Sequence, residues 1–327
     1  MGAPCLHPGV LSFSHVSLRH LLVVAATIAV LAVSGVALHH LLAGIVWNDV
    51  VTAVHAIPTA ALALSGVLTA VSYFILTGFD VLALRLVGRR VPYPVTALAA
   101  FTSYIFSHNL GFAALTGGAA RYRIYGRHGV PLGDVGQIMI VAGVTFWLGA
   151  FLLLGLAFVV LPDLPAIGDR AVPPAFQTAA GLATLALLAG YMIALAILDG
   201  RSVRLWRWQV RLPTWRMAVA QFALGTLDLL TATAVLFVLL PAPDVALYPL
   251  VLVGYLLAII SSLLVHAPGG LGVFEVVMLA ALPQIERTGL VAALLTFRLV
   301  YYLIPLALGV VLFAGHEVVA LRRSRDA

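Results

Sequence analysis

The chain has 327 residues, of which 63% are apolar and 9% charged, and 18 basic against 12 acidic residues give a net charge of +6. Soluble domains carry about 25% charged residues, so this composition excludes a soluble domain, a disordered chain and a disulfide-stapled scaffold. The only cysteine, Cys5, cannot form an internal disulfide. Lipid is the solvent that suits so much apolar surface, so the sequence predicts an all-α, polytopic integral membrane protein.

Seven apolar runs are long enough to cross a bilayer, because a helix needs about 20 apolar residues to span the hydrocarbon layer. They cover residues 21–43, 57–79, 132–161, 175–198, 216–240, 245–265 and 289–318. Two further apolar stretches, 94–128 and 266–284, are interrupted by glycine, proline and charge. The sequence therefore predicts about seven to eight transmembrane helices together with one or two re-entrant or broken helices.

Arginine placement predicts the orientation, because cytoplasmic loops of membrane proteins carry an excess of basic residues. Four arginine clusters are expected on the cytoplasmic side, at residues 85–90, 121–127, 201–216 and 322–325, and two arginine-poor loops outside, at 163–174 and 241–244. Both ends of the stretch 94–128 then lie on one side, which predicts a re-entrant hairpin or a pair of half-helices. Residues 266–284 form either a short crossing or a second re-entrant piece.

The same pattern divides the chain into three parts. Residues 1–20 are expected to be an N-terminal cytoplasmic segment without a cleavable signal peptide, 21–320 the membrane domain, and 321–327 a short basic cytoplasmic tail. Because the basic residues follow membrane topology rather than one continuous patch, we expect no nucleic acid partner.

Residues 200–216 carry five arginines and three tryptophans. Arg201, Arg204, Arg207 and Arg211 fall roughly on one helical face, which indicates an interfacial helix that sets the topology. Recruitment of anionic lipid headgroups is a compatible second role for this segment.

The first candidate site lies in the first interrupted stretch. Gly117 and Gly118 permit backbone turns that other residues resist, and Asn109 can satisfy amide groups that a broken helix frees. Arg121 and Arg123 follow the break. A guanidinium group matches phosphate oxygens bidentately, so both arginines are candidates for phosphate binding, and cytoplasmic anchoring is the alternative.

The second candidate site begins at His266 in the second interrupted stretch. Pro268 ends the preceding helix, Gly269 and Gly270 form a turn, and a half-helix starts a few residues later, with Glu275 about one turn inside it. The amide groups at a half-helix start can bind an anion. A carboxylate buried there needs a cationic partner, either a protein arginine or a substrate ammonium; a structural ion pair is the alternative.

Two further ionisable residues lie within predicted spans. Arg298 begins the segment that contains Tyr302, and it can snorkel outwards, pair with Glu275 or bind a phosphate. Asp228 lies too deep in its helix to reach water. The patterns His108-x-x-Gly111 and His266-x-x-Gly269 match across the two interrupted stretches, and interrupted segments at matching places in two halves point to a transporter site.

Motifs of several enzyme and cofactor classes are missing from the sequence. It contains no Walker A, C-x-x-C, H-E-x-x-H or G-x-S-x-G pattern. We therefore expect no ATP-driven engine, no metal, no cofactor and no catalytic residue.

Three segments, SHNLGFAALTGGAARYRIY, VHAPGGLGVFE and FRLVYYLIPL, closely resemble the membrane domain of the lysylphosphatidylglycerol synthetase/flippase family, which includes the bacterial multiple peptide resistance factor. The resemblance extends from about residue 20 to about residue 320. It implies a lipid flippase of the bacterial cytoplasmic membrane. In full-length members a separate domain aminoacylates phosphatidylglycerol, and the flipped product confers resistance to cationic antimicrobial peptides.

The chain departs from full-length members in ending at Ala327, directly after the last span. The resemblance therefore implies a standalone form without transferase activity, and standalone members can move other lipids. The expected substrate is aminoacylated phosphatidylglycerol, whose phosphate would meet Arg121, Arg123 and Arg298. Its ammonium groups would meet Glu275 and Asp228.

Two other functions stay open at this stage. Broken helices also suit a secondary transporter of a small solute, and the protein could instead be the membrane partner of a separately encoded aminoacyl-lipid synthase. The expected partners are membrane phospholipids and, as options, that synthase and a second copy of the chain.

Overall fold

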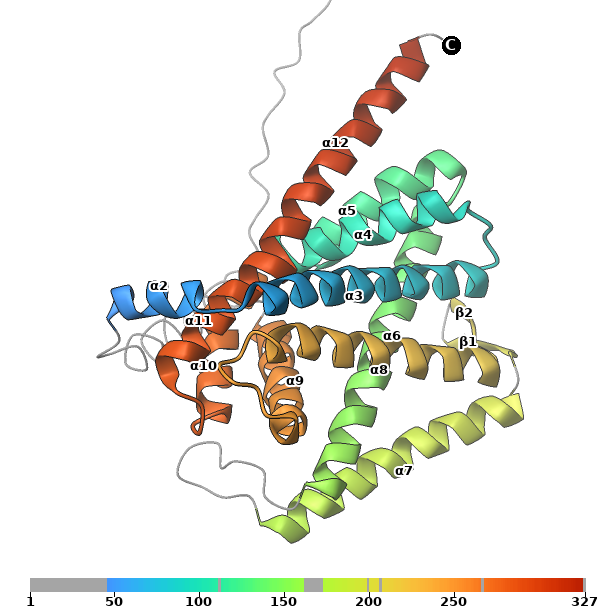
Figure 1. The fold of residues 1–327 in the computed structure, drawn as a ribbon. Coiled ribbons are helices and arrows are strands. Elements are labelled where there is room, and N and C mark those ends of the chain that lie inside the picture. Colours follow the sequence, from blue (N-terminus) through green and yellow to red (C-terminus); the bar gives the residue numbers. More distant parts are fainter. Residues whose placement is uncertain are drawn as a thin grey trace, which may run out of the picture.

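The computed structural model describes residues 46–110, 113–161, 173–198, 200–205, 208–265 and 268–325. Apart from one short hairpin, the regular structure in these ranges is helical, which confirms the predicted all-α, multi-pass membrane fold (Figure 1). The predicted first span, residues 21–43, and the N-terminal segment before it lie outside the described residues, as do most of the 163–174 loop and His266.

The α-helices are α2 (Trp47–His55), α3 (Thr59–Leu86), α4 (Tyr93–Leu110), α5 (Ala113–Tyr125), α6 (Leu132–Val160), α7 (Pro174–Leu198), α8 (Trp215–Phe237), α9 (Tyr248–Val265), α10 (Val273–Ala281), α11 (Arg287–Phe297) and α12 (Ile304–Arg325). Single turns of 3₁₀-helix are η1 (Gly126–His128), η2 (Val245–Leu247) and η3 (Pro268–Gly270), and a π-helix, η4 (Arg298–Leu303), joins α11 to α12. The strands are β1 (Ser202–Leu205) and β2 (Trp208–Arg211).

Six helical runs in the described residues are long and apolar enough to cross a membrane. They are Thr59–Leu86, Leu132–Val160, Pro174–Leu198, Trp215–Phe237, Val245–Val265 and Arg287–Val318. These confirm six of the seven predicted spans, with the last one bent through η4. The first of them continues beyond the predicted end at residue 79, so that Asp80 lies inside α3 rather than after it.

The first interrupted stretch is a pair of half-helices, as predicted. Helices α4 and α5 lie side by side (Figure 1), and the Ser103 hydroxyl on α4 donates to the Gly117 carbonyl on α5 at 2.7 Å. The two ends of the pair meet, because Arg89, before α4, bonds Asp134, after α5, with 2.5 Å between Nε and Oδ2.

The second interrupted stretch is too short to cross. Helix α10 has nine residues and is therefore about 14 Å long, against a hydrocarbon layer of about 30 Å. It folds back on α9, where a Cβ placed on Gly254 would lie 3.2 Å from the Cβ of Ala281. Of the two alternatives for this stretch, the structure therefore has the re-entrant one.

The prediction of a helix over residues 200–216 is wrong. Strands β1 and β2 form an antiparallel hairpin in which Val203 pairs with Val210 and Leu205 with Trp208. The sequence alternates apolar and polar residues in both strands, a period of two that favours strands over the helical spacing of the arginines. Helix α8 begins only at Trp215, with Thr214 as its N-cap.

Helices α6 and α8 cross at two glycines. A Cβ placed on Gly149 would lie 2.3 Å from the carbonyl carbon of Gly225, and one on Gly225 would lie 2.2 Å from the Thr145 carbonyl oxygen. Small residues allow such close approach between membrane helices.

The α3–α4 turn, η1 and the β1–β2 hairpin gather at one end of the molecule, on the right in Figure 1, and we call this the arginine-rich end. The α8–α9 connection lies at the opposite end. Both placements agree with the grouping of loops that the arginine pattern predicts.

Candidate functional site

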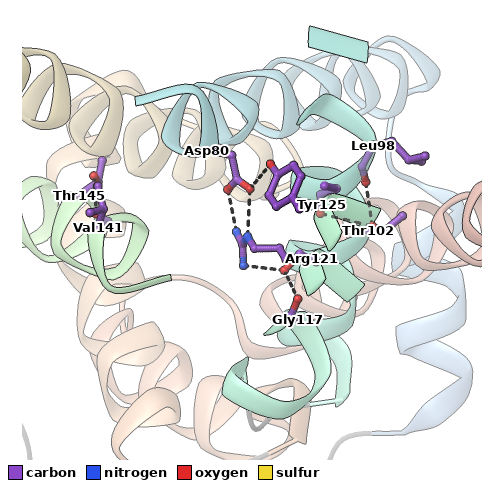
Figure 2. Close-up of polar contacts among 10 residues, drawn as sticks. Asp80, Leu98, Thr102, Gly117, Arg121, Tyr125, Val141 and Thr145 are labelled. Atoms are coloured by element: carbon purple, nitrogen blue, oxygen red, sulfur yellow. Dashed lines mark hydrogen bonds and ion pairs between the residues drawn. The ribbon is translucent and has the colours of Figure 1, made fainter. Parts of the chain in front are cut away.

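Arg121 forms a buried ion pair with Asp80, the residue that directly follows the predicted span 57–79. Its Nε and Nη2 donate to the two oxygens of Asp80 at 3.0 and 2.8 Å, and Tyr125 donates to the same carboxylate at 2.7 Å (Figure 2). Arg121 Nη1 donates to Ser103 at 2.6 Å, and the guanidinium lies 4.7 Å from the Tyr104 ring centre. The pair is inaccessible to solvent, since Asp80 is 0% and Arg121 3% exposed.

The glycines next to this pair let α5 approach α4. A Cβ on Gly117 would lie 2.1 Å from the Ser107 hydroxyl oxygen and 2.9 Å from the Ser103 carbonyl oxygen. A Cβ on Gly118 would meet the sulfur of Met139 at 3.0 Å. Both glycines lie inside α5, so the prediction of backbone turns at these positions is wrong. They instead allow α5 to pack closely against α4 and α6.

Glu275 and Arg298 pair directly, which is one of the partners that the sequence offered for each. Arg298 Nε donates to Glu275 Oε1, and Nη1 donates to the Gly269 carbonyl at 2.8 Å. Glu275 Oε2 accepts from the backbone N–H of Gly272 at 2.8 Å, so the carboxylate also caps the start of α10. Among the described residues, nothing bonds the buried Nη2 of Arg298.

The two interrupted stretches meet at this ion pair. A Cβ on Gly269 would lie 3.4 Å from the carbonyl oxygen of Asn109 at the end of α4. Gly269 has φ +61° and Gly270 φ +64°, a left-handed backbone that other residues rarely adopt. The Asn109 amide donates to the Ile105 carbonyl at 2.9 Å and, more weakly, to that of Tyr302 at 3.4 Å.

Asp228 has a neutral surrounding. It accepts a hydrogen bond from the Ser72 hydroxyl at 2.6 Å, and that hydroxyl also lies 2.8 Å from the Tyr301 hydroxyl. Tyr73 donates to the Tyr301 carbonyl at 3.1 Å. Asp228 is 6% exposed, and no arginine or histidine pairs with it in the part of the chain that the structure describes.

A cavity of about 250 Å³, which we call the central cavity, brings Arg121 and Asp228 to one space. Helices α3, α4, α5, α6, α8 and α9 and the π-helix η4 contribute to its wall. Seven aromatic side chains line it: Phe79, Tyr104, Phe146, Trp147, Tyr255, Tyr301 and Tyr302. The Tyr104 hydroxyl and His108 Nδ1, also in this lining, have no hydrogen-bond partner among the described residues.

Arg123 lies apart from both sites. Its guanidinium pairs with Glu317 of α12 at 2.8 Å, where Arg127 also binds at 2.9 Å, and its side chain is 58% exposed. This cluster ties α5 to α12.

The predicted site residues thus fall into three groups. Arg121, Asp228 and Tyr302 line the central cavity; Asn109, Gly269, Glu275 and Arg298 surround the second ion pair; and Arg123 is on the surface. Tyr302 joins the first two groups, because the Arg298 guanidinium lies 5.6 Å from its ring centre. The structure therefore does not gather Arg121, Arg123 and Arg298 around one phosphate.

Sequence reasoning missed Asp80, Ser72 and the aromatic wall. Asp80 precedes three arginines and so looked like part of an interfacial charge cluster. Ser72 and Tyr73 are adjacent polar residues within an apolar run. That pair, deep in a predicted span, was the one sequence feature that could have marked Ser72 as a site residue.

Comparison with known proteins identifies the family. Residues 22–309 match the family described as the lysylphosphatidylglycerol synthase TM region. Uncharacterized protein slr0712 of Synechocystis sp. is 32% identical over 281 residues, which cover 85% of this chain and 86% of the relative. Inner membrane protein YbhN of Escherichia coli is 30% identical over 274 residues, 82% of this chain and 83% of the relative. The chain therefore belongs to the lysylphosphatidylglycerol synthase transmembrane-region family.

Proposed function

We propose that this protein translocates a phospholipid whose headgroup carries an amine, with aminoacylated phosphatidylglycerol as the expected substrate. The observation that carries the proposal is Asp228, a buried carboxyl group on the wall of an aromatic-lined cavity. Ionisable groups inside membrane segments are costly and mark substrate pathways. The proposed activity is transport without a covalent step, so it needs no catalytic residue.

Charge within the central cavity favours a cation. Arg121 is neutralised by Asp80 through two hydrogen bonds, so this pair adds no net charge. Within the described residues Asp228 accepts a hydrogen bond from the Ser72 hydroxyl and has no cationic partner, so a substrate ammonium beside it would complete an ion pair. The cavity therefore suits an amine better than a free anion.

The aromatic wall supports the same ligand. Tyrosine, tryptophan and phenylalanine rings attract ammonium groups within about 6 Å, and aromatic cages are a recurrent way to bind them. The unpartnered Tyr104 hydroxyl and His108 Nδ1 can form hydrogen bonds with a polar headgroup.

Cavity size indicates that only part of a lipid enters. A volume of about 250 Å³ is below the roughly 300–1,000 Å³ of pockets that enclose drug-sized ligands, so the acyl chains must lie elsewhere. An apolar groove of about 600 Å³, bounded by α3, α4, η4 and α12, can hold them. Tyr73 lines this groove and bonds Tyr301, which lines the cavity, so one aromatic layer separates the two spaces.

The phosphate has a candidate partner in Arg298. Its Nη2 is buried, lacks a partner within the described residues, and belongs to a guanidinium that lies near Tyr302. A headgroup extending from Asp228 past Tyr302 would present its phosphate to this nitrogen. Glu275 then holds the guanidinium in place rather than binding the ammonium.

Asp228→Asn is the sharpest test, because asparagine can still accept the Ser72 hydrogen bond while the charge is lost. In vesicles with the reconstituted protein, lysylphosphatidylglycerol should become accessible to a membrane-impermeant amine reagent over time. The rate of this exposure should be at least tenfold lower in the variant. Arg123→Gln on the surface serves as the control and should keep it. An unchanged rate in Asp228→Asn would contradict the proposal.

Glu275→Gln is a poorer probe than the sequence suggested, because it also breaks the ion pair with Arg298.

Uptake of lysine or another small amine into the same vesicles, with no lipid exposure, would instead favour a small-solute transporter.

A further inference from the structure

A second pocket, separate from the central cavity, lies at the arginine-rich end. It has about 310 Å³, and Arg85, Arg89 and Arg90 line it at the turn from α3 to α4, together with Tyr93. We call it the basic pocket. The proposed function gives these arginines no role beyond setting the topology.

Two of the three charges are uncompensated. Arg89 pairs with Asp134 at 2.5 Å, whereas Arg85 and Arg90 form no ion pair with any residue that the structure describes. Both side chains are exposed at the mouth of a concave site. Such a site binds an anion, and the guanidinium fork fits phosphate oxygens.

The basic pocket adjoins the apolar groove at one residue. Tyr93 lines both spaces, and its hydroxyl lies 3.1 Å from that of Thr77, which lines the groove. The groove then continues along α3 as far as Gly66. Eleven residues of helix rise about 17 Å, roughly half of the 30 Å hydrocarbon layer and so the depth of one leaflet.

We propose that the basic pocket and the apolar groove together bind one anionic phospholipid from the leaflet at the arginine-rich end. Arg85 and Arg90 hold its phosphate, and an acyl chain lies in the groove between α3, α4 and α12. Positive charge at the interface end and apolar surface along one leaflet complement the two parts of such a lipid. Phosphatidylglycerol and its aminoacylated form share the phosphate that this site contacts. This inference therefore rests on the proposed function, for which the site is where the lipid is loaded before its headgroup reaches the central cavity.

The test measures binding of dioleoyl phosphatidylglycerol to detergent-purified full-length protein by native mass spectrometry. Arg85→Gln/Arg90→Gln should weaken retention of this lipid at least tenfold. Retention of dioleoyl phosphatidylcholine should fall much less, because its choline group offsets the charge of the phosphate. Ala97→Phe, which fills the groove, should weaken retention of both lipids. Arg216→Gln, an exposed arginine outside the pocket, is the matched control and should bind as the unmodified chain does.

Wild-type retention of phosphatidylglycerol in the double arginine variant would overturn the site. Displacement of the lipid by millimolar inorganic phosphate alone would also overturn it, since the pocket would then bind a soluble anion without need of the groove. Asp228→Asn should retain the lipid fully. Lipid retention in a protein that exposes no lipid in vesicles would count against the proposed function while leaving this site intact.

Discussion

Replacing Asp80 by asparagine should destabilise the α4–α5 hairpin strongly. The carboxylate is fully buried and accepts two hydrogen bonds from Arg121 and one from Tyr125. Removing one partner of a buried pair leaves an uncompensated charge and costs about 3–5 kcal/mol. Two hydrogen bonds to charged groups, at about 1.5–3 kcal/mol each, give a similar sum.

The assay is the melting temperature in detergent, read from the monodisperse fraction that survives heating. At about 2–4 °C per kcal/mol for large domains, Asp80→Asn should lower it by on the order of 10 °C. Arg123→Gln is the control, because it removes an exposed ion pair with Glu317 that α5 makes only two residues from Arg121. Exposed pairs contribute little, so the control should shift the melting temperature only slightly.

A double variant shows whether the loss of stability in Asp80→Asn comes from the unpaired charge of Arg121. Asp80→Asn/Arg121→Met removes both charges, and replacing a buried ion pair by apolar groups is often neutral, so most of the lost stability should return. If Asp80→Asn melted like Arg123→Gln, or if the double variant were less stable than Asp80→Asn alone, the ion pair would not hold the hairpin.

The remaining predictions concern packing and pH. Gly117→Ala should cost about 1–3 kcal/mol by overpacking against α4, seen as a lower melting temperature; Gly136→Ala in α6, which has open space around it, should not. Backbone N–H groups, first that of Gly289, donate to Glu286 and lower the pKa of this carboxyl group below its usual value of 4.5. Because the pKa of Glu286 is lower in the folded state, its carboxylate stabilises the fold above the unfolded-state pKa, and this stabilisation is lost as the pH falls through the folded-state pKa. The melting temperature should therefore drop in that acidic range, and it should drop less in Glu286→Gln.

Hydrophobic runs alone predicted the spans. Each crossing helix satisfies its own backbone, so an apolar stretch of sufficient length determines its structure locally. The interruption between α4 and α5 and the one from Pro268 to Gly272 were also visible, because glycine and proline act on the backbone where they stand. Gly117 and Gly118 are the exception, since both lie inside α5. The α3 boundary was placed too early because a single charge, Asp80, was taken as the end of a span.

The hairpin at 202–211 shows how two local signals can conflict. Arginines at 201 and 204 fit a helical face, while the alternation of apolar and polar residues fits strands. Pairing between the two strands decided between them, and that pairing is not a property of either segment alone.

The sequence by itself determined that this is a multi-pass helical membrane protein, which family it belongs to, and which few polar residues lie within its apolar runs. Tertiary structure decided what each polar residue binds. Arg121 meets Asp80 across 41 residues, Arg298 meets Glu275 across 23, and Asp228 meets Ser72 across 156. The physical reason is that the bilayer acts on each helix separately, whereas a buried charge is stabilised only by a partner that packing brings from elsewhere in the chain.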